Sequence, residues 1–197
     1  MRKILIATLL TFPALAFSQV KSVDVSTLIA GPSENFYLFA NGMPSTPTKY
    51  TRINSGSPYY RDIFEKATLV FPNGKAAKDQ LIRLDLVTGE IQFKNDKGDE
   101  MIATIPVERI IFANGTEGQP EVFIHGSLLP TDEKKLKAAW FLDCSTENAP
   151  CYQLHTKKLD EYKQYNSATT EINIVEKKSF YTIQDSVLVE VKKGRKK

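Results

Sequence analysis

Hydrophobic and polar residues alternate with a period of two through the middle of the chain. The segment 82–86 shows the pattern clearly: Ile82, Leu84 and Leu86 are apolar, and the two residues between them are charged. Successive side chains of a β-strand point to opposite faces of a sheet, whereas a helix repeats every 3.6 residues. The alternation therefore predicts strands with one apolar face and one solvated face.

Turn-forming residues separate these alternating segments at short intervals. The pair Asn73-Gly74 is a strong signal for a tight turn. Further turns are predicted at Thr88-Gly89, Asn95–Asp99 and Asn114–Pro120. Short strands joined by such turns are typical of an antiparallel meander.

The last third of the chain has the same character with less regular spacing. β-branched and aromatic residues favour strands at 137–142, 152–155, 172–174, 180–183 and 187–191. Between the second and third of these segments, apolar residues recur every three positions over 157–165. That spacing fits a short helix and a twisted edge strand equally. No long amphipathic helix is visible. We therefore expect a mostly β protein with little helix, an antiparallel meander forming a curled sheet, a sandwich or an open barrel.

The first eighteen residues have the pattern of a secretory signal peptide. Two basic residues precede an apolar segment, Ile4–Leu15, and the small residues Ala16 and Ser18 stand at positions −3 and −1 of a cleavage site. The apolar segment is short for a membrane span, and no later segment is long enough, so we expect no transmembrane segment in the mature chain. The expected location is the periplasm, the outer-membrane periphery or the extracellular space.

The chain divides into four segments. After the signal peptide, residues 19–60 form an irregular N-terminal lead, interrupted by Pro, Gly and Asn and expected to pack in part on the next segment. That segment, residues 61–191, forms the β-rich domain, and residues 192–197 form a basic tail. The whole chain has 197 residues and a formal net charge of +3, too small for a general nucleic-acid binder.

Export changes how the two cysteines are interpreted. Cys144 and Cys151 enclose six residues rich in turn formers, and an even pair in an oxidising compartment most often forms a disulfide. A bridge closing so short a loop stabilises the fold by about 2–3 kcal/mol in the chain-entropy model. The alternatives are a redox pair, whose usual motif has two intervening residues, or a metal site.

The segment from Gly56-Ser-Pro-Tyr-Tyr through Phe71-Pro-Asn-Gly to the strands Leu81–Leu86 and Ile91–Phe93 resembles a group of secreted β-rich proteins of Bacteroidota. The resemblance extends to the C-terminal Phe180-Tyr-Thr-Ile and Leu188-Val-Glu-Val. The chain departs from that pattern around Asp85 and at the cysteine pair. The resemblance implies a β-rich envelope protein and supplies no catalytic residues.

The sequence lacks the motifs of common enzyme classes. It contains no G-x-S-x-G, H-E-x-x-H, phosphate-binding P-loop or G-x-G-x-x-G pattern. His125 stands two residues before Ser127 and could act as its base, but a histidine at a strand end before a turn is the simpler interpretation. His155 is the second of two histidines, thirty residues from the first, so we expect no metal site and no cofactor.

Clustered carboxylates are the remaining candidates for acid–base chemistry. The clusters comprise Asp96, Asp99, Glu100, Asp132, Glu133, Asp160 and Glu161. A glycosidase needs two carboxylates facing each other across a cleft, and solvated turn residues are the simpler interpretation. The acidic segment 96–100 lacks a full calcium-ligand series, so it predicts a hairpin turn.

Aromatic residues offer candidate ligand-binding positions. Tyr59, Tyr60, Trp140 and Tyr181 belong to adjacent aromatic pairs, and in a strand one member of such a pair points outward. Outward rings can stack on a sugar or a peptide. The basic tail 192–197 offers a second contact, because its positive charges favour an anionic surface.

These features predict an exported, non-catalytic protein that binds or scaffolds an envelope component, either a protein or a glycan. The alternative is a small secreted hydrolase acting on glycan or peptide, with His125 or a carboxylate cluster in its site.

Overall fold

The computed structural model describes residues 42–45, 50, 53–115, 118–147, 149–163, 165 and 170–191. The signal peptide 1–18, most of the lead 19–60 and the basic tail 192–197 lie outside the described residues. The predictions that concern the signal peptide and the tail therefore stay predictions.

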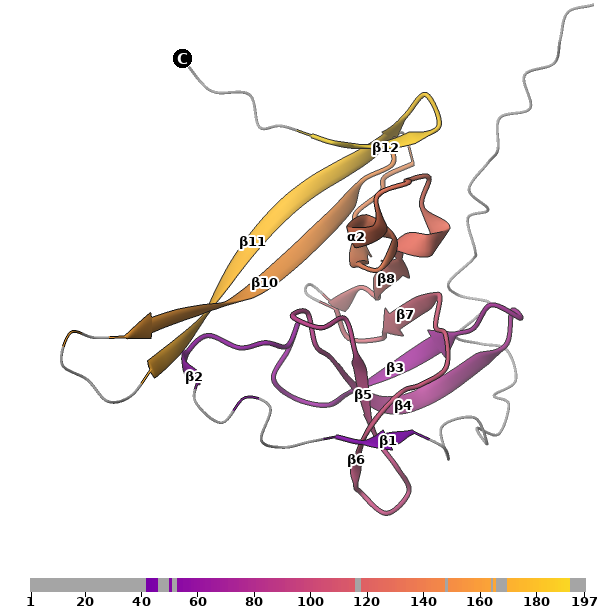
Figure 1. Cartoon of the computed structure of the whole chain (residues 1–197). Helices are drawn as coiled ribbons and strands as arrows, with labels where there is room; N and C mark the ends of the chain where they lie inside the picture. The colour runs from indigo at the N-terminus through magenta and orange to yellow at the C-terminus, as the bar shows by residue number, and fades with distance from the viewer. Residues whose placement is uncertain are drawn as a thin grey trace, which may run out of the picture.

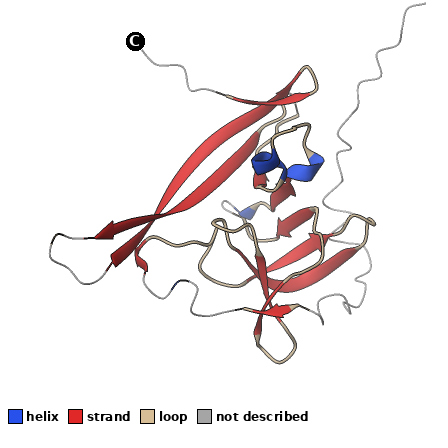
Figure 2. Ribbon diagram, viewed as in Figure 1, coloured by secondary structure: helices blue, strands red, loops and turns tan. Residues whose placement is uncertain are grey.

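Twelve strands of the described residues form one open sheet, with little helix (Figures 1 and 2). The mostly β fold predicted from the alternation is confirmed. The elements in chain order are β1 (Met43–Pro44), β2 (Ile53–Ser55), β3 (Glu65–Val70), β4 (Ala76–Leu84), β5 (Ile91–Lys94), β6 (Glu100–Ile102), β7 (Arg109–Phe112), β8 (Glu121–His125), the 3-10 helix η3 (Gly126–Leu128), α2 (Lys134–Lys137), β9 (Trp140–Asp143), β10 (Tyr152–Lys163), β11 (Thr170–Gln184) and β12 (Val187–Glu190).

The sheet is an antiparallel meander in which the strand order departs from the chain order at one place, where β7 lies beside β3. Its order is β1-β6-β5-β4-β3-β7-β8-β9-β10-β11-β12. The chain builds outward from β3 through β4, β5 and β6, and it then returns so that β7 pairs with the other edge of β3. Within the described residues, the parallel pairing is that of β2 with β11. The segment 157–165, which fitted helix or strand equally, continues β10 as far as Lys163.

Two hydrophobic cores lie on opposite faces of the β8–β9 pair. Phe123 and Trp140 pack in the first core, whereas their neighbours Ile124 and Phe141 pack in the second. Because successive strand residues alternate between faces, this division buries both faces of β8 and β9. The sequence pattern predicted one solvated face, and the structure differs here because η3 and α2 cover the second face: Leu136 of α2 belongs to the second core.

The hairpin of β10 and β11 extends well beyond the strand that precedes it (Figure 1). Strand β9 pairs with β10 over residues 152–154 alone, while β10 and β11 pair over the full length of β10. We call the extended part, Thr156–Lys163 of β10 with Thr170–Lys177 of β11, the arm. Strand β2 covers the outer edge of β11 near the end of the arm. Among the described residues, the outer edge of β10 has no partner strand beyond Leu154.

The described part of the N-terminal lead packs on the sheet. Strand β1 pairs with β6, and the hydroxyl of Tyr50 donates a 2.5 Å hydrogen bond to the carboxylate of Asp85. Asp85 is fully buried, and its other carboxylate oxygen accepts the backbone N–H groups of Val87 and Thr88. This carboxylate therefore fixes the turn after β4, whose residues 86–89 line a cleft.

Candidate functional site

The disulfide between Cys144 and Cys151 closes the loop that joins β9 to β10. The two Cα atoms are 4.9 Å apart, and the backbone N–H of Cys144 donates to the carbonyl of Cys151. The hydroxyl of Ser145 accepts the N–H of Cys151 at 3.0 Å. A bridge at this position holds the first residues of β10 in register, and it is compatible with an exported protein.

Tyr59 and Tyr60 lie in different surroundings although they are adjacent in sequence. The guanidinium of Arg83 lies 3.8 Å from the ring centroid of Tyr59. The ring of Tyr60 packs on the first core, 4.7 Å from the centroid of Phe123 in an edge-to-face arrangement. Both rings therefore have contacts within the protein.

Trp140 belongs to the first core, on which Tyr60 also packs, whereas Tyr181 belongs to the second core. Trp140 is 5% exposed, and its indole N–H donates a 3.0 Å hydrogen bond to the carbonyl of Gly89. Tyr181 is half-buried in the second core, edge-to-face with Phe141 at 5.6 Å. Three of the four aromatic candidates pack in a core, while Tyr59 lies against Arg83, so the four are not assembled into a single stacking surface.

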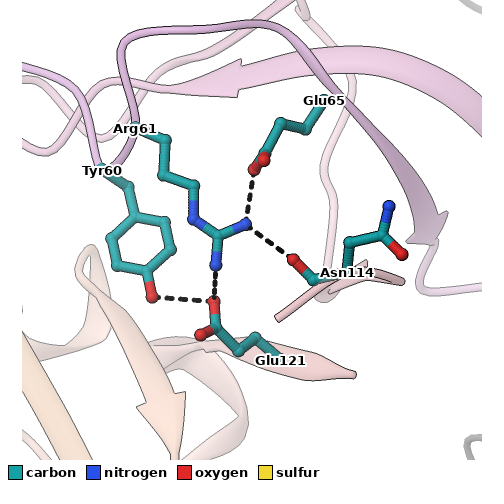
Figure 3. Close-up of polar contacts among 5 residues, drawn as sticks. All are labelled: Tyr60, Arg61, Glu65, Asn114 and Glu121. Carbon is teal, nitrogen blue, oxygen red and sulfur yellow. Dashed lines mark hydrogen bonds and ion pairs between the residues drawn. The ribbon is translucent and has the colours of Figure 1, made fainter. Parts of the chain in front are cut away.

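A network of polar side chains surrounds Arg61 (Figure 3). Its guanidinium donates to Glu65 and to Glu121, both at 2.6 Å, and to the carbonyl of Asn114 at 3.0 Å. The hydroxyl of Tyr60 donates to the same oxygen of Glu121 at 2.8 Å. Burial and the neighbouring carboxylate of Glu121 raise the pKa of Tyr60 well above its usual range, so the phenol stays protonated.

His155 connects this network to the arm. Its ring is perpendicular to the ring of Tyr60, with 5.6 Å between centroids, and its Nδ1 lies 2.8 Å from a carboxylate oxygen of Glu176 on β11. The side chain is 5% exposed, and Nε2 is buried without a hydrogen-bond partner in the described part of the chain. Burial lowers the pKa of His155, outweighing the hydrogen bond to Glu176 that raises it. The ring is therefore neutral in the folded protein near pH 7.

His125 and Ser127 are brought together, in the geometry of a helix cap. Nδ1 of His125 lies 2.8 Å from the Ser127 hydroxyl and accepts the backbone N–H of the same serine, at the start of η3. In a catalytic triad, the histidine links the nucleophile to a carboxylate that orients the ring. Among the described residues, no carboxylate forms a hydrogen bond with the His125 ring, so the contact acts here as a cap.

The predicted hairpin turn at 96–100 joins β5 to β6. The side-chain oxygen of Asn95 accepts the backbone N–H groups of Lys97 and Asp99, each at 2.9 Å. These bonds explain the tight turn without a bound cation. Within the described residues, no three His, Cys, Asp or Glu side chains are grouped so that they could hold a metal ion.

A cleft of about 380 Å³ lies where the free edge of β10 begins. One side is the β10 segment 154–158, the second is the turn 86–89, and the third is formed by α2 and the residues after it as far as Trp140. The hydrogen bond from the Trp140 indole to Gly89 ties two of these sides together. Lys135, Lys158 and Glu133 supply charge around a largely apolar lining.

The cleft and the adjoining strand edge are suited to binding an extended segment. An edge strand presents N–H and C=O groups that another strand can pair with. His155 lines the cleft, but its ring is packed against Tyr60 and its Nδ1 contacts Glu176. The described groups therefore provide backbone pairing and apolar contact, and they do not present an acid–base pair to the cleft.

Comparison with known proteins gives no match: no family, no curated protein and no solved structure is significantly similar to this chain. As to membranes, no helix in the described ranges has both the length and the apolar character needed to span one.

Several of these features could not be predicted from the sequence. Arg61 and Glu121 are sixty residues apart. Arg61 lies in the loop before β3 and Glu121 on β8, and they meet because β7 pairs with β3 and β8 pairs with β7. The free edge of β10 depends on β9 being short, which no local pattern indicates. The one available signal was the ambiguous segment 157–165, whose mixed character is typical of an edge strand.

Proposed function

We propose that this protein is an exported, non-catalytic protein that binds or scaffolds an envelope component, and that it does so by strand addition. An extended segment of a partner protein pairs with the free edge of β10 beside the cleft. The observation that carries this proposal is that, among the described residues, no strand pairs with the outer edge of β10 from His155 onward, whereas β2 and β12 pair with two parts of the outer edge of β11.

Strand addition uses main-chain hydrogen bonds for affinity and alternate side chains for specificity. The arm is held in place before a partner arrives, because Lys157 donates to the carbonyl of Tyr59 and β2 pairs with β11. An edge that is already ordered loses less conformational entropy on binding. The adjoining cleft offers the partly buried Leu86 and Leu154 as apolar contacts for side chains of the added segment.

The polar groups around Arg61 and His155 support binding in preference to hydrolysis. Tyr60, Arg61 and Glu121 are hydrogen-bonded to one another, and His155 is held by Glu176. Groups that are satisfied internally act as structural supports, whereas catalytic groups face the site where substrate lies. The export part of the proposal is supported by the disulfide and by the signal-peptide pattern.

The test is site-specific photo-crosslinking in the cells that make the protein. A photoreactive residue replaces Thr156, which lies at the cleft on the free edge, and in the control it replaces Lys97, which is exposed in the β5–β6 turn. We expect a discrete covalent adduct with a protein of the envelope from position 156 and none from position 97. Equal labelling from both positions, or none from position 156, would contradict the proposal.

A further inference from the structure

The free edge of the arm carries an unusual arrangement of charge. Two lysines, Lys157 and Lys158, precede Leu159, and two carboxylates, Asp160 and Glu161, come directly after it. Lys157 contacts Tyr59, but in the described part of the chain the other three charged side chains have no ion-pair partner. All three are exposed, and the residues opposite them on β11 are uncharged: Val175, Asn173 and Ile172.

This arrangement is complementary to itself when the strand runs in the opposite direction. If two copies of β10 pair antiparallel about Leu159, Lys158 stands opposite the partner's Asp160, and Lys157 stands opposite the partner's Glu161. A two-fold axis generates each pair twice, and Leu159 then faces the partner's Leu159. Opposite charges and apolar pairs directly across two strands stabilise the pairing, and like charges destabilise it.

Other registers lose this complementarity. If one strand slides by one residue, only one kind of opposite-charge pair remains. It is Lys157 with the partner's Asp160 in one direction, and Lys158 with the partner's Glu161 in the other. Sliding it by two residues places either Asp160 opposite the partner's Asp160 or Lys158 opposite the partner's Lys158. A parallel, in-register pairing sets every charge against the same charge. The sequence thus favours one antiparallel register and disfavours its neighbours, which is how register is specified in natural sheets.

We propose that the partner at the β10 edge is the arm of a second copy of this chain, so that β11 and β10 of one subunit continue into β10 and β11 of the other. This inference rests on the proposed function, because it names the partner that strand addition recruits at the same edge. Leu159 is 43% exposed in the single chain, and the pairing covers it. The paired arms then connect the two subunits of a symmetric scaffold.

Charge reversal tests the register in solution. The full chain is examined by light scattering across a concentration series, and we expect twice the mass of one chain. Lys158→Glu and Asp160→Lys each create two like-charge pairs and should weaken dimerisation by about tenfold, while the double variant restores opposite charges and should recover it. Lys134→Glu on α2, also exposed, is the control that should change nothing.

A cysteine placed on the two-fold axis gives a second, geometric readout. Leu159→Cys should form a disulfide with its own copy, because residues directly opposite in an antiparallel pair have Cβ atoms about 4.5–5.5 Å apart. Val175→Cys, 52% exposed one strand further in, should not. The native cysteines are bridged to each other and do not interfere.

The outcomes separate this inference from the proposed function. A chain that is monomeric at every concentration, or a dimer that ignores both charge reversals and forms no bond through residue 159, overturns self-pairing. If the adduct at Thr156 then contains a different protein, strand addition stands with another partner. If no adduct forms at Thr156 either, both proposals fail.

Discussion

The ammonium group of Lys157 donates a hydrogen bond to the backbone carbonyl of Tyr59, 98 residues earlier in the chain. This bond joins the base of the arm to the loop before β3. The adjacent residue, Tyr60, packs on the first core and contacts the ring of His155. The start of the arm is therefore held by contacts to two adjacent residues of one loop, Tyr59 and Tyr60. As a result, the free edge of the arm has a defined position.

Stability should fall as the pH falls below about 6.5, and His155 should account for part of the loss. Burial lowers the pKa of His155 from 6.5, although Glu176 opposes this and Lys178 and Lys157 reinforce it. The unfolded chain therefore binds a proton at His155 at a higher pH than the folded chain does. The contribution of His155 to the free energy of unfolding is complete above pH 6.5 and decreases as the pH falls towards the folded-state pKa.

The measurement is urea unfolding of wild type and His155→Gln at several pH values between 7.5 and 5.5, a range chosen to span the unfolded-state pKa. The variant should show a smaller decrease in unfolding free energy over that range. His125, whose pKa burial also lowers, remains in both proteins, so the difference isolates His155. Identical slopes would show that His155 titrates normally.

Removing the Arg61 side chain should destabilise the fold by about 2–3 kcal/mol, because it leaves two partly buried carboxylates without their charged donor. The side chains of Arg61 and Glu121 are 24% and 12% exposed. Lys137→Ala is the control, since its ion pair with Asp132 is exposed and should contribute less than about 0.5 kcal/mol. Equal effects of Arg61→Ala and Lys137→Ala on urea unfolding would refute a structural role for the network.

Gly56 lies close to the arm. Its φ is +78°, and a Cβ atom there would lie 2.7 Å from the carbonyl oxygen of Ile174. Gly56→Ala should cost about 2–3 kcal/mol, combining backbone strain with displacement of β2 from β11. Gly98→Ala has the same strain, with φ +87°, but open space around it, so it should cost about 1 kcal/mol. If the two variants unfold at the same temperature, position 56 has room for a Cβ atom beside β11.

Loss of the disulfide should lower the unfolding free energy by about 2.5 kcal/mol, because the bridge restricts a short loop in the unfolded chain. The comparison is between wild type and Cys144→Ser/Cys151→Ser, each with and without reductant. Reductant should destabilise the wild type alone. A wild-type unfolding curve that does not respond to reductant would mean that the bridge contributes nothing to stability.

The parts of this fold that depend on local pattern could be predicted, and the parts that depend on topology could not. Asn73-Gly74 marks the turn between β3 and β4, and Cys144 and Cys151 mark the loop between β9 and β10, because both signals lie within a few residues. The pairing of β7 with β3 sets residues far apart in sequence side by side. No local rule predicts that choice, and the Arg61–Glu121 contact results from it.

Amide hydrogen exchange of the isotope-labelled full chain shows whether the edge of β10 accepts another strand. In the dilute chain, every second amide from Thr156 to Lys163 faces the free edge and should exchange fast, while the intervening amides bond to β11. At high concentration, or with an envelope fraction from the cells that make the protein, the edge-facing amides should slow by about tenfold or more and the others should not change. Edge-facing amides that exchange equally fast under all three conditions would show that the edge of β10 does not accept another strand.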